Sequence, residues 1–276
     1  MTDPAEQLPT RAQLESFERD GYLLVEDALP AEKVADLLTV IASLEARLQD
    51  SPHRRQVFGL DIRPLITEDE AFLELMEWPA TFPLAVRFLG HWNLQLTTSH
   101  LIMVPPNPDQ RNTGWHDDGG KPFFAVDGIR PFMSLKVGYF LTDLLEESMG
   151  SLMVVPGSHR QPGRPTWDDG DPDPHGVVEL KLRAGAAVIF QQGVWHAGAP
   201  NLSQKTRVVL YYGYSSRLLR PIDYERMPQE ILDRCTPIGR QLLGDKSSHL
   251  GYYIPTDDDV PLKPWYIERF GTAVRD

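Results

Sequence analysis

The sequence contains almost no cysteine and comparatively few basic residues. Cys235 is the single cysteine in 276 residues, which excludes an internal disulfide and any metal site built from several thiolates. Lys and Arg together number 27 against 39 Asp and Glu, so the formal net charge is −12. No cluster of Lys and Arg marks a phosphate-binding face, and we therefore expect a small-molecule partner rather than nucleic acid or an anionic membrane.

Long apolar runs are also missing. No stretch reaches the length that a membrane-spanning helix needs. The first residues, "MTDPAEQLPTRAQL", carry acids and prolines where a signal peptide has a basic start and an apolar run. From these features we expect a cytoplasmic protein whose whole chain takes part in the fold.

The hydrophobic pattern changes near Leu94. Before it, residues 30–48 have the three-and-four apolar spacing of an amphipathic helix, "DGYLLVEDAL" indicates a short strand, and residues 68–89 predict helical pieces broken at Pro79 and Pro83. After it come short apolar runs bounded by turn residues, followed by a helix at "PQEILDRCTPIGRQLLG" and an irregular tail. The pattern predicts one domain, a helical shell around a β-sandwich or barrel. The runs are "LQLTTSHLIMV", "MSLKVGYFLT", "GSLMVVP", "GVVELKL", "AAVIF" and "TRVVLYYGYS".

Residues 114–120, "GWHDDGG", combine a histidine, two acids and a glycine pair. In an extended segment successive side chains alternate faces, so His116 and Asp118 point the same way and Asp117 points opposite. The motif is either half of a metal site or a capped polar turn. A non-heme iron site would need a second histidine from elsewhere, with coordination positions left open for a cosubstrate and oxygen.

His196 and Arg207 favour the metal interpretation. His196 in "VIFQQGVWHAGAPNLSQKTRVVLYY" ends a strand-like segment, and a Pro-Asn-Leu-Ser turn then sends the chain back as a second strand that carries Arg207. Arg207 is followed by Val208, Val209 and Leu210, a run that is apolar on both faces. A guanidinium among aliphatic side chains is costly unless an anion pairs with it, and the far carboxylate of a dicarboxylate cosubstrate would be such an anion.

Four stretches in this order resemble the phytanoyl-CoA dioxygenase family of iron(II)- and 2-oxoglutarate-dependent oxygenases. They are "DGYLLVEDAL", "WHDD", "GSLMVVPGSHR" and "VWHAGAPNLSQKTR", which leave about the last quarter of the chain outside the likeness. The resemblance implies a double-stranded β-helix, a cupin-like jelly-roll, spanning about residues 91–216. A helical part of about residues 1–90 would precede it and an extension of residues 217–276 would follow.

The resemblance also implies the roles of the site residues. His116, Asp118 and His196 would bind Fe(II), and Arg207 would bind the C5 carboxylate of 2-oxoglutarate. O₂ would then be consumed with release of succinate and CO₂ while a small-molecule substrate is hydroxylated. Two positions depart from the commonest family pattern: Gly198 stands where many members carry a hydroxyl-bearing residue, and Asp117 stands where glutamine is frequent. Because Asp118 is intact, halogenation is disfavoured.

Several other residues have two interpretations, a role in the site and an ordinary structural or surface role. His100 is a candidate for cosubstrate binding, with structural hydrogen bonding as the alternative. Trp115 and Trp195 suit core packing at least as well as a substrate wall, and His159 suits a turn better than a metal site. Arg217 and Arg220 are more often solvated salt bridges than substrate contacts. The acidic segment of residues 168–176 predicts a solvated loop, and His53, His91, His175 and His249 lack partners at metal spacing.

Two other functions compete with the oxygenase. A jelly-roll that binds a small molecule without turnover would predict a broken ligand triad, whereas this triad is intact. A zinc hydrolase with two histidines and one carboxylate would need a general base and would have no use for a buried Arg207. Neither the substrate nor the oligomeric state follows from the sequence.

Overall fold

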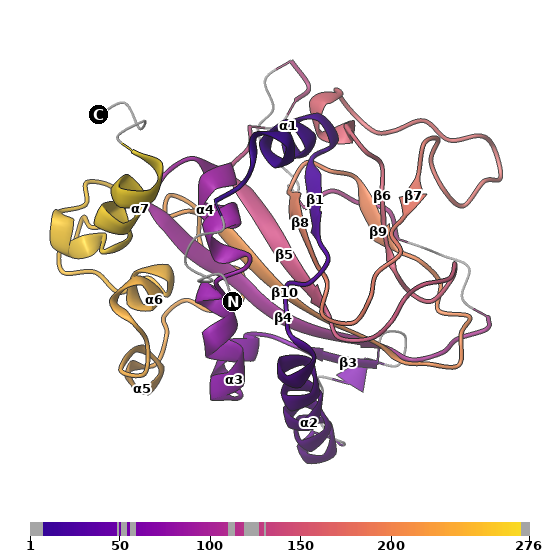
Figure 1. Ribbon diagram of the computed structural model, residues 1–276, viewed down its shortest axis with the longest axis horizontal. Coiled ribbons are helices and arrows are strands. Elements are labelled where there is room, and N and C mark those ends of the chain that lie inside the picture. The colour runs from indigo at the N-terminus through magenta and orange to yellow at the C-terminus, as the bar shows by residue number, and fades with distance from the viewer. Residues whose placement is uncertain are drawn as a thin grey trace.

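Two facing β-sheets with a layer of helices make up the fold. The computed structural model describes residues 8–48, 50, 54–55, 59–109, 114–118, 127–129 and 131–271. Within them, the larger sheet has seven strands in the order β1-β8-β5-β10-β4-β3-β2, and the smaller has the order β7-β6-β9. Helices cover the side of the larger sheet that faces away from the smaller one (Figure 1). The expected mainly β fold, a jelly-roll with a helical shell, is confirmed.

The strands agree closely with the apolar runs of the sequence. Three of them, β1, β2 and β3, come from the first 90 residues, so that part of the chain is not helical throughout. The strands are β1 (Tyr22–Val25), β2 (Arg54–Arg55), β3 (Gly59–Ile62), β4 (Leu94–Val104), β5 (Ser134–Phe140), β6 (Leu152–Val154), β7 (Val178–Glu179), β8 (Ala187–Gln191), β9 (His196–Gly198) and β10 (Arg207–Ser216).

The helices form where local signals allow them. In α2, the predicted three-and-four spacing places Val34, Leu37, Ile41 and Leu44 on the buried face. Before β1, Thr10 caps α1 through a capping box. The helices are α1 (Arg11–Asp20), α2 (Ala31–Arg47), α3 (Glu70–Leu73), α4 (Phe82–Leu89), α5 (Gln229–Leu232), α6 (Pro237–Leu242) and α7 (Leu262–Phe270), with 3-10 turns η2 (Leu65–Thr67), η3 (Glu74–Glu77), η4 (Ser158–Arg160) and η5 (Asp257–Asp259).

Two predictions about helices were wrong. Pro83 does not break a helix but lies in the first turn of α4, where its missing N–H removes no hydrogen bond. The tail expected to be irregular contains α7, whose Leu262 and Tyr266 are buried in the main core. Its weakly amphipathic sequence becomes helical through this packing, which local periodicity does not reveal.

Strand β10 shows why the larger sheet is apolar on both faces. Tyr212 and Tyr214 point to the helical layer and donate to the backbone carbonyls of Phe72 (2.8 Å) and Met76 (2.7 Å). Tyr211, one residue away, points to the opposite face and packs in the core between the sheets. The helices therefore hold the sheet from outside, and the inner face is left for the site.

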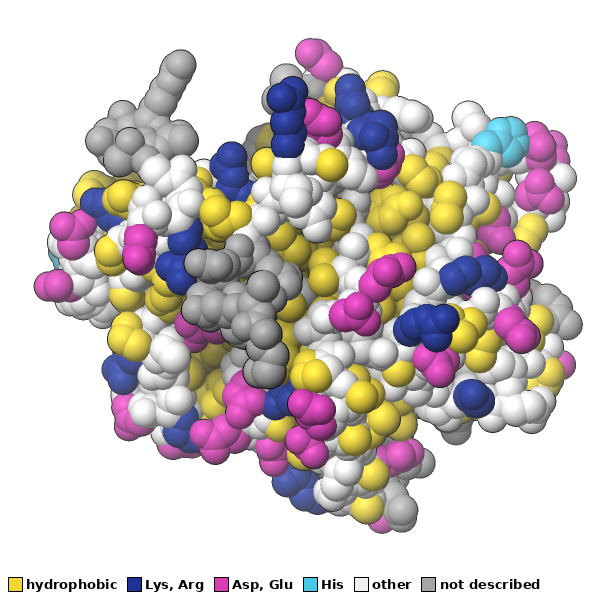
Figure 2. Space-filling model, viewed as in Figure 1, with side chains coloured by type: hydrophobic (Ala, Val, Ile, Leu, Met, Phe, Trp, Pro, Cys, Tyr) yellow, Lys and Arg dark blue, Asp and Glu magenta, His cyan; other side chains and the backbone are white. Residues whose placement is uncertain are grey.

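The surface agrees with the acidic composition. The face in Figure 2 shows acidic and basic side chains interspersed with apolar ones, without a continuous basic stripe, and acidic groups gather near α2 and α3. Among the described residues, no helix combines the length and the apolar character needed to cross a membrane.

Candidate active site

Three side chains from two segments of the chain converge. His116 and Asp118 come from the segment before β5, and His196 is the first residue of β9. One potential ligand atom from each lies within 4.8 Å of the others. Nε2 of His116 is 3.9 Å from Asp118 Oδ1, and Nε2 of His196 is 3.6 Å from Asp118 Oδ2.

Backbone pairing explains why these residues meet. His116 and His196 form an isolated antiparallel bridge in which each amide donates to the other's carbonyl, at 3.1 and 2.9 Å. Paired residues project their side chains to the same face, so the two rings lie with centroids 4.4 Å apart. The amide of Asp118 donates to the carbonyl of Gln192 at 2.9 Å and fixes the carboxylate beside them.

Both imidazoles are oriented for metal binding. Nδ1 of His116 lies 2.8 Å from the carbonyl of Gly114, and Nδ1 of His196 lies 2.9 Å from the carbonyl of Val194. A carbonyl only accepts, so each Nδ1 carries the proton and each Nε2 presents a lone pair to the space between the three residues. Two imidazole nitrogens and one carboxylate on one side fit the donor set of a non-heme iron(II) site.

The electrostatics keep His196 and Asp118 in the protonation states that a metal requires. Burial lowers the pKa of His196 to about 4, which leaves the ring neutral at physiological pH. Burial alone would raise the pKa of Asp118, but the Lys136 ammonium and the two histidines outweigh it and hold the pKa well below its usual range. The Lys136 ammonium lies 2.8 Å from Asp118 Oδ2.

Arg207 lies buried at the start of β10, deeper between the sheets. Its Nη2 donates to the hydroxyl of Tyr211 at 2.8 Å, and its guanidinium lies near the rings of Tyr211 and Phe140. Only 5% of Arg207 is exposed, its Nε makes no hydrogen bond, and within the described part of the chain it has no ion pair. A buried cation in this state is suited to an anionic ligand.

His100 lies on the same inner face as Tyr211, its register partner across β4 and β10. Its Nε2 lies 2.7 Å from Asp61 Oδ1 on β3. Burial lowers the pKa of His100 to about 4, and the positive charges of Arg63 and Lys136 act in the same direction. The hydrogen bond to Asp61 and its negative charge raise the pKa, but by less. The neutral ring therefore donates to Asp61 through Nε2 and keeps Nδ1 as an acceptor.

The acidic loop contacts the segment that carries His116. Nε1 of Trp115 donates to Asp173 Oδ1 at 2.8 Å, and Trp115 also packs beside the small cluster of Met153, Ala197 and Ala199. Thus residues 168–176 form the loop that the sequence predicted, and one of its acids is attached next to the metal-ligand candidates. Trp195 packs edge-on against Trp167, with ring centroids 6.1 Å apart.

Some predicted details were wrong. His196 begins a strand of the smaller sheet, and the chain then crosses to the larger sheet, so β9 and β10 are not neighbours. Arg217 is neither a solvated salt bridge nor a substrate contact, because it is buried and donates to the carbonyls of Asp259 (3.0 Å) and Asp245 (3.4 Å). His159 lies in the turn η4, as expected. Gly119, Gly120 and His53 fall outside the described residues.

Sequence reasoning missed Lys136 and Tyr211. The available signal for Lys136 was the one used for Arg207, a charged residue inside a strand that is otherwise apolar. The available signal for Tyr211 was its spacing, because in an extended strand it lies on the same face as Arg207, four residues before it.

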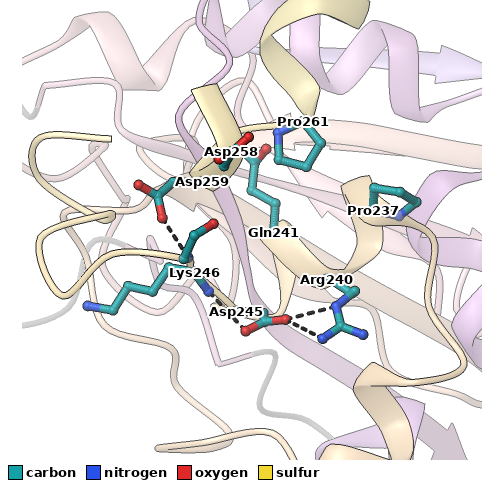
Figure 3. Close-up of a pocket in the computed structure, with 9 residues that line it drawn as sticks. Pro237, Arg240, Gln241, Asp245, Lys246, Asp258, Asp259 and Pro261 are labelled. Carbon is teal, nitrogen blue, oxygen red and sulfur yellow. Dashed lines mark hydrogen bonds and ion pairs between the residues drawn. The ribbon is translucent and has the colours of Figure 1, made fainter. Parts of the chain in front are cut away.

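A second hollow lies in the C-terminal part, away from these residues. Pro237, Arg240, Gln241, Asp245, Lys246 and Asp259 line it (Figure 3). Arg240 is paired with Asp245 at 2.8 Å, and the carboxylate of buried Asp259 accepts from the backbone and side chains of Ser248 and Thr256. These groups satisfy one another, so the hollow is a structural junction.

The phytanoyl-CoA dioxygenase (PhyH) family model matches residues 17–209, a span that contains all three ligand candidates and Arg207. The chain belongs to the phytanoyl-CoA dioxygenase family. Among its relatives, an ectoine dioxygenase of Nocardia farcinica is 26% identical over 235 residues, covering 74% of this chain and 77% of that protein. Dioxygenase olcK of Penicillium canescens is 27% identical over 275 residues, covering 88% and 86%.

Solved structures show the same fold. EctD from S. alaskensis with bound Fe has a TM-score of 0.61 at 20% identity, covering 85% of this chain and 89% of that one. HygX from Streptomyces hygroscopicus, with nickel and 2-oxoglutarate bound, has a TM-score of 0.61 at 18% identity, covering 78% and 90%. With the family established and a His-Asp-His donor set in place, this phytanoyl-CoA dioxygenase family member is an iron(II)- and 2-oxoglutarate-dependent dioxygenase.

Proposed function

We propose that the enzyme hydroxylates a small molecule and that His116, Asp118 and His196 are its iron ligands. The observation that carries this proposal is the convergence of three ligand atoms within 4.8 Å, with both Nδ1 atoms engaged by backbone carbonyls. Bound iron would supply the activation of O₂. One oxygen atom then enters succinate as 2-oxoglutarate loses CO₂, and the other enters the substrate C–H bond as a hydroxyl group.

In this proposal, Arg207 holds the C5 carboxylate of 2-oxoglutarate. Its unpaired Nε and its planar guanidinium suit a forked carboxylate contact, and Tyr211 fixes the guanidinium from one side. Gly198 lies two residues after His196 on β9, and a Cβ there would meet no atom within 4 Å, so room remains beside the ligand. The missing hydroxyl-bearing side chain thus leaves space and removes one contact.

His100, as a neutral residue, would contribute to 2-oxoglutarate binding indirectly. It lies opposite Tyr211 in the register, and its bond to Asp61 leaves Nδ1 as an acceptor. An acceptor nitrogen does not bind a carboxylate directly, so we expect His100 to act through hydroxyl groups such as that of Tyr211. We also propose that the enzyme is cytoplasmic, on the ground of its single cysteine.

The first test is an anaerobic titration of the apoprotein with Fe(II) and then with 2-oxoglutarate. We expect the weak visible charge-transfer band of an iron-chelated 2-oxo acid in the wild type. Arg207→Ala should need at least tenfold more 2-oxoglutarate for half the band, whereas the exposed Arg183→Ala should match the wild type. Bound iron without a band in the wild type would refute the cosubstrate assignment and favour a non-catalytic binding protein or a zinc hydrolase.

The metal ligands are tested by a matched pair of neighbouring acids. Asp118→Ala removes a ligand candidate, whereas Asp117→Ala removes a carboxylate that does not belong to the triad. We expect Fe(II) or Mn(II) to raise the melting temperature of the wild type and of Asp117→Ala, because binding to the native state stabilises it. A metal-induced shift of wild-type size in Asp118→Ala would contradict the assignment.

A further inference from the structure

Lys136 brings a positive charge into the space beside the ligand candidates. It lies on β5, paired with Phe190 of β8 and Gly213 of β10, so its side chain shares their inner face. Gly213 has no side chain, and the lysine stem lies close to it: a Cβ on Gly213 would come 3.8 Å from Lys136 Cγ. The ammonium reaches 2.8 Å from Asp118 Oδ2.

In the protein without metal, the Asp118 carboxylate forms an ion pair with Lys136. The Lys136 side chain is 23% exposed, and its ion pair with Asp118 is the one found for it among the described residues. The same carboxylate oxygen lies 3.6 Å from His196 Nε2 and faces the space between the ligand atoms. Lys136 and a bound metal would therefore share the carboxylate of Asp118.

A bound dication would deprive Lys136 of the negative charge that Asp118 supplies. It would take over the charge of the Asp118 carboxylate and would also repel the ammonium. The two carboxylates of 2-oxoglutarate would be used by the metal and by Arg207. Lys136 would then be a largely buried cation without an anion of its own, a state that is costly unless a further negative group arrives.

The nearest other acids do not fill this role. Asp61 is already bonded to His100 at 2.7 Å. Asp223 accepts from the amide of Ser99 at 2.8 Å, and although the charge of Lys136 acts on it, no ion pair joins the two residues. Among the described residues no acid other than Asp118 forms an ion pair with Lys136, so we look to the primary substrate for the further negative group.

We propose that Lys136 binds a carboxylate of the primary substrate, which makes the substrate class a small carboxylic acid. This inference rests on the proposed iron and 2-oxoglutarate site. Lys136 is released from Asp118 when the metal binds and then anchors the substrate beside the iron.

The test compares carboxylic acids with their primary amides. A panel of aliphatic, aromatic and amino acids, each matched by its carboxamide, is titrated anaerobically into the Fe(II) and 2-oxoglutarate complex, and the change of the visible band gives an apparent Kd. Calorimetry on the same samples gives a second measurement of binding. The variants are Lys136→Met, Lys136→Arg and, as a matched control, the surface Lys181→Met, whose side chain is 43% exposed.

We expect at least one acid to bind the wild type at least tenfold more tightly than its amide. Lys136→Met should abolish this preference, Lys136→Arg should retain part of it, and Lys181→Met should leave it unchanged. The 2-oxoglutarate concentration for half the band should change less than threefold in Lys136→Met. Melting temperatures of the apoproteins show whether Lys136→Met is folded. Because Lys136→Arg retains the positive charge, it tests the role of charge even if Lys136→Met does not fold.

Two results would overturn the inference. The first is that no acid in the panel binds the wild type better than it binds Lys136→Met. The second is a rise in the 2-oxoglutarate requirement of Lys136→Met as large as that of Arg207→Ala, which would make Lys136 a cosubstrate residue. A wild type without the band would instead be a failure of the proposed function, and calorimetry would still measure the acid and amide preference separately.

Discussion

Arg207 donates a hydrogen bond to the hydroxyl of Tyr211, four residues further along β10 and 2.8 Å away. Residues at this spacing lie on the same face of a strand, so the tyrosine fixes the direction of the guanidinium inside the space between the sheets. The pair joins the residue that the sequence identified to one that only the structure identified. It also provides a direct test of how the cosubstrate is oriented.

Replacing Tyr211 by Phe should weaken 2-oxoglutarate binding while leaving iron binding intact. A lost hydrogen bond of about 1 kcal/mol corresponds to an increase of about fivefold in the 2-oxoglutarate concentration for half the visible band. The neighbouring Tyr212→Phe is the control, because its hydroxyl bonds to Phe72 on the opposite face. We expect Tyr212→Phe to lower stability by about 1 kcal/mol with no effect on 2-oxoglutarate; equal 2-oxoglutarate requirements in both variants would contradict the assignment.

Acid should destabilise the metal-free protein through His100. Burial lowers its pKa to about 4 in the folded state from 6.5, so between these values the unfolded chain binds a proton that the folded chain does not. The free energy of unfolding therefore falls as the pH drops from about 6.5 to about 4, by up to about 3 kcal/mol from this residue. His196 contributes in the same direction, since burial also lowers its pKa to about 4.

Urea unfolding of the metal-free protein at a series of pH values measures this effect. His100→Gln should show a shallower decline of stability between pH 6.5 and 4 than the wild type, because one histidine whose pKa is lowered in the fold no longer titrates. The exposed His249→Gln is the control and should keep the wild-type slope. An unchanged slope in His100→Gln would show that the His100 ring is already protonated in the fold.

Removing the carboxylate of Asp173 should loosen the acidic loop. The hydrogen bond from Trp115 to Asp173 is charge-assisted, and its loss should cost the loop about 1.5–3 kcal/mol of local stability. Limited proteolysis followed by mass mapping should detect faster cleavage within residues 168–176 in Asp173→Ala, with iron affinity changed less than threefold. Asp171→Ala, on the same loop but exposed, should be cleaved like the wild type, and equal rates in both variants would argue against an attached loop.

Arg217 should matter for stability and not for the substrate. Arg217→Ala removes the buried hydrogen bonds to the carbonyls of Asp259 and Asp245, and we expect a loss of about 2 kcal/mol in the free energy of unfolding. Arg220→Ala, three residues on and exposed, should stay within about 0.5 kcal/mol of the wild type. Denaturant unfolding compares the two, and a full-length protein of wild-type stability with Arg217→Ala would refute the structural role.

The sequence by itself predicted most of the strands, though not β2, β3 or β9, and the candidate iron ligands. Strand β4 has the bounds of the run that predicted it, and its residues are largely buried because both faces of the larger sheet are covered. The spacing of His116 and Asp118 places them on one side of an extended segment, and His196 and Arg207 then favoured a metal site over a polar turn. Arg207 stood out because a charge inside such a strand is costly without a partner.

The tertiary structure decided what depends on contacts between distant segments. Lys136 meets Asp118 because the strands and the segment before β5 bring residues of different segments together, which no single strand encodes. Arg217 became a structural residue once the C-terminal helices folded over the end of β10. Local periodicity fixes which residues share a face, whereas only the packing of the two sheets fixes which faces meet.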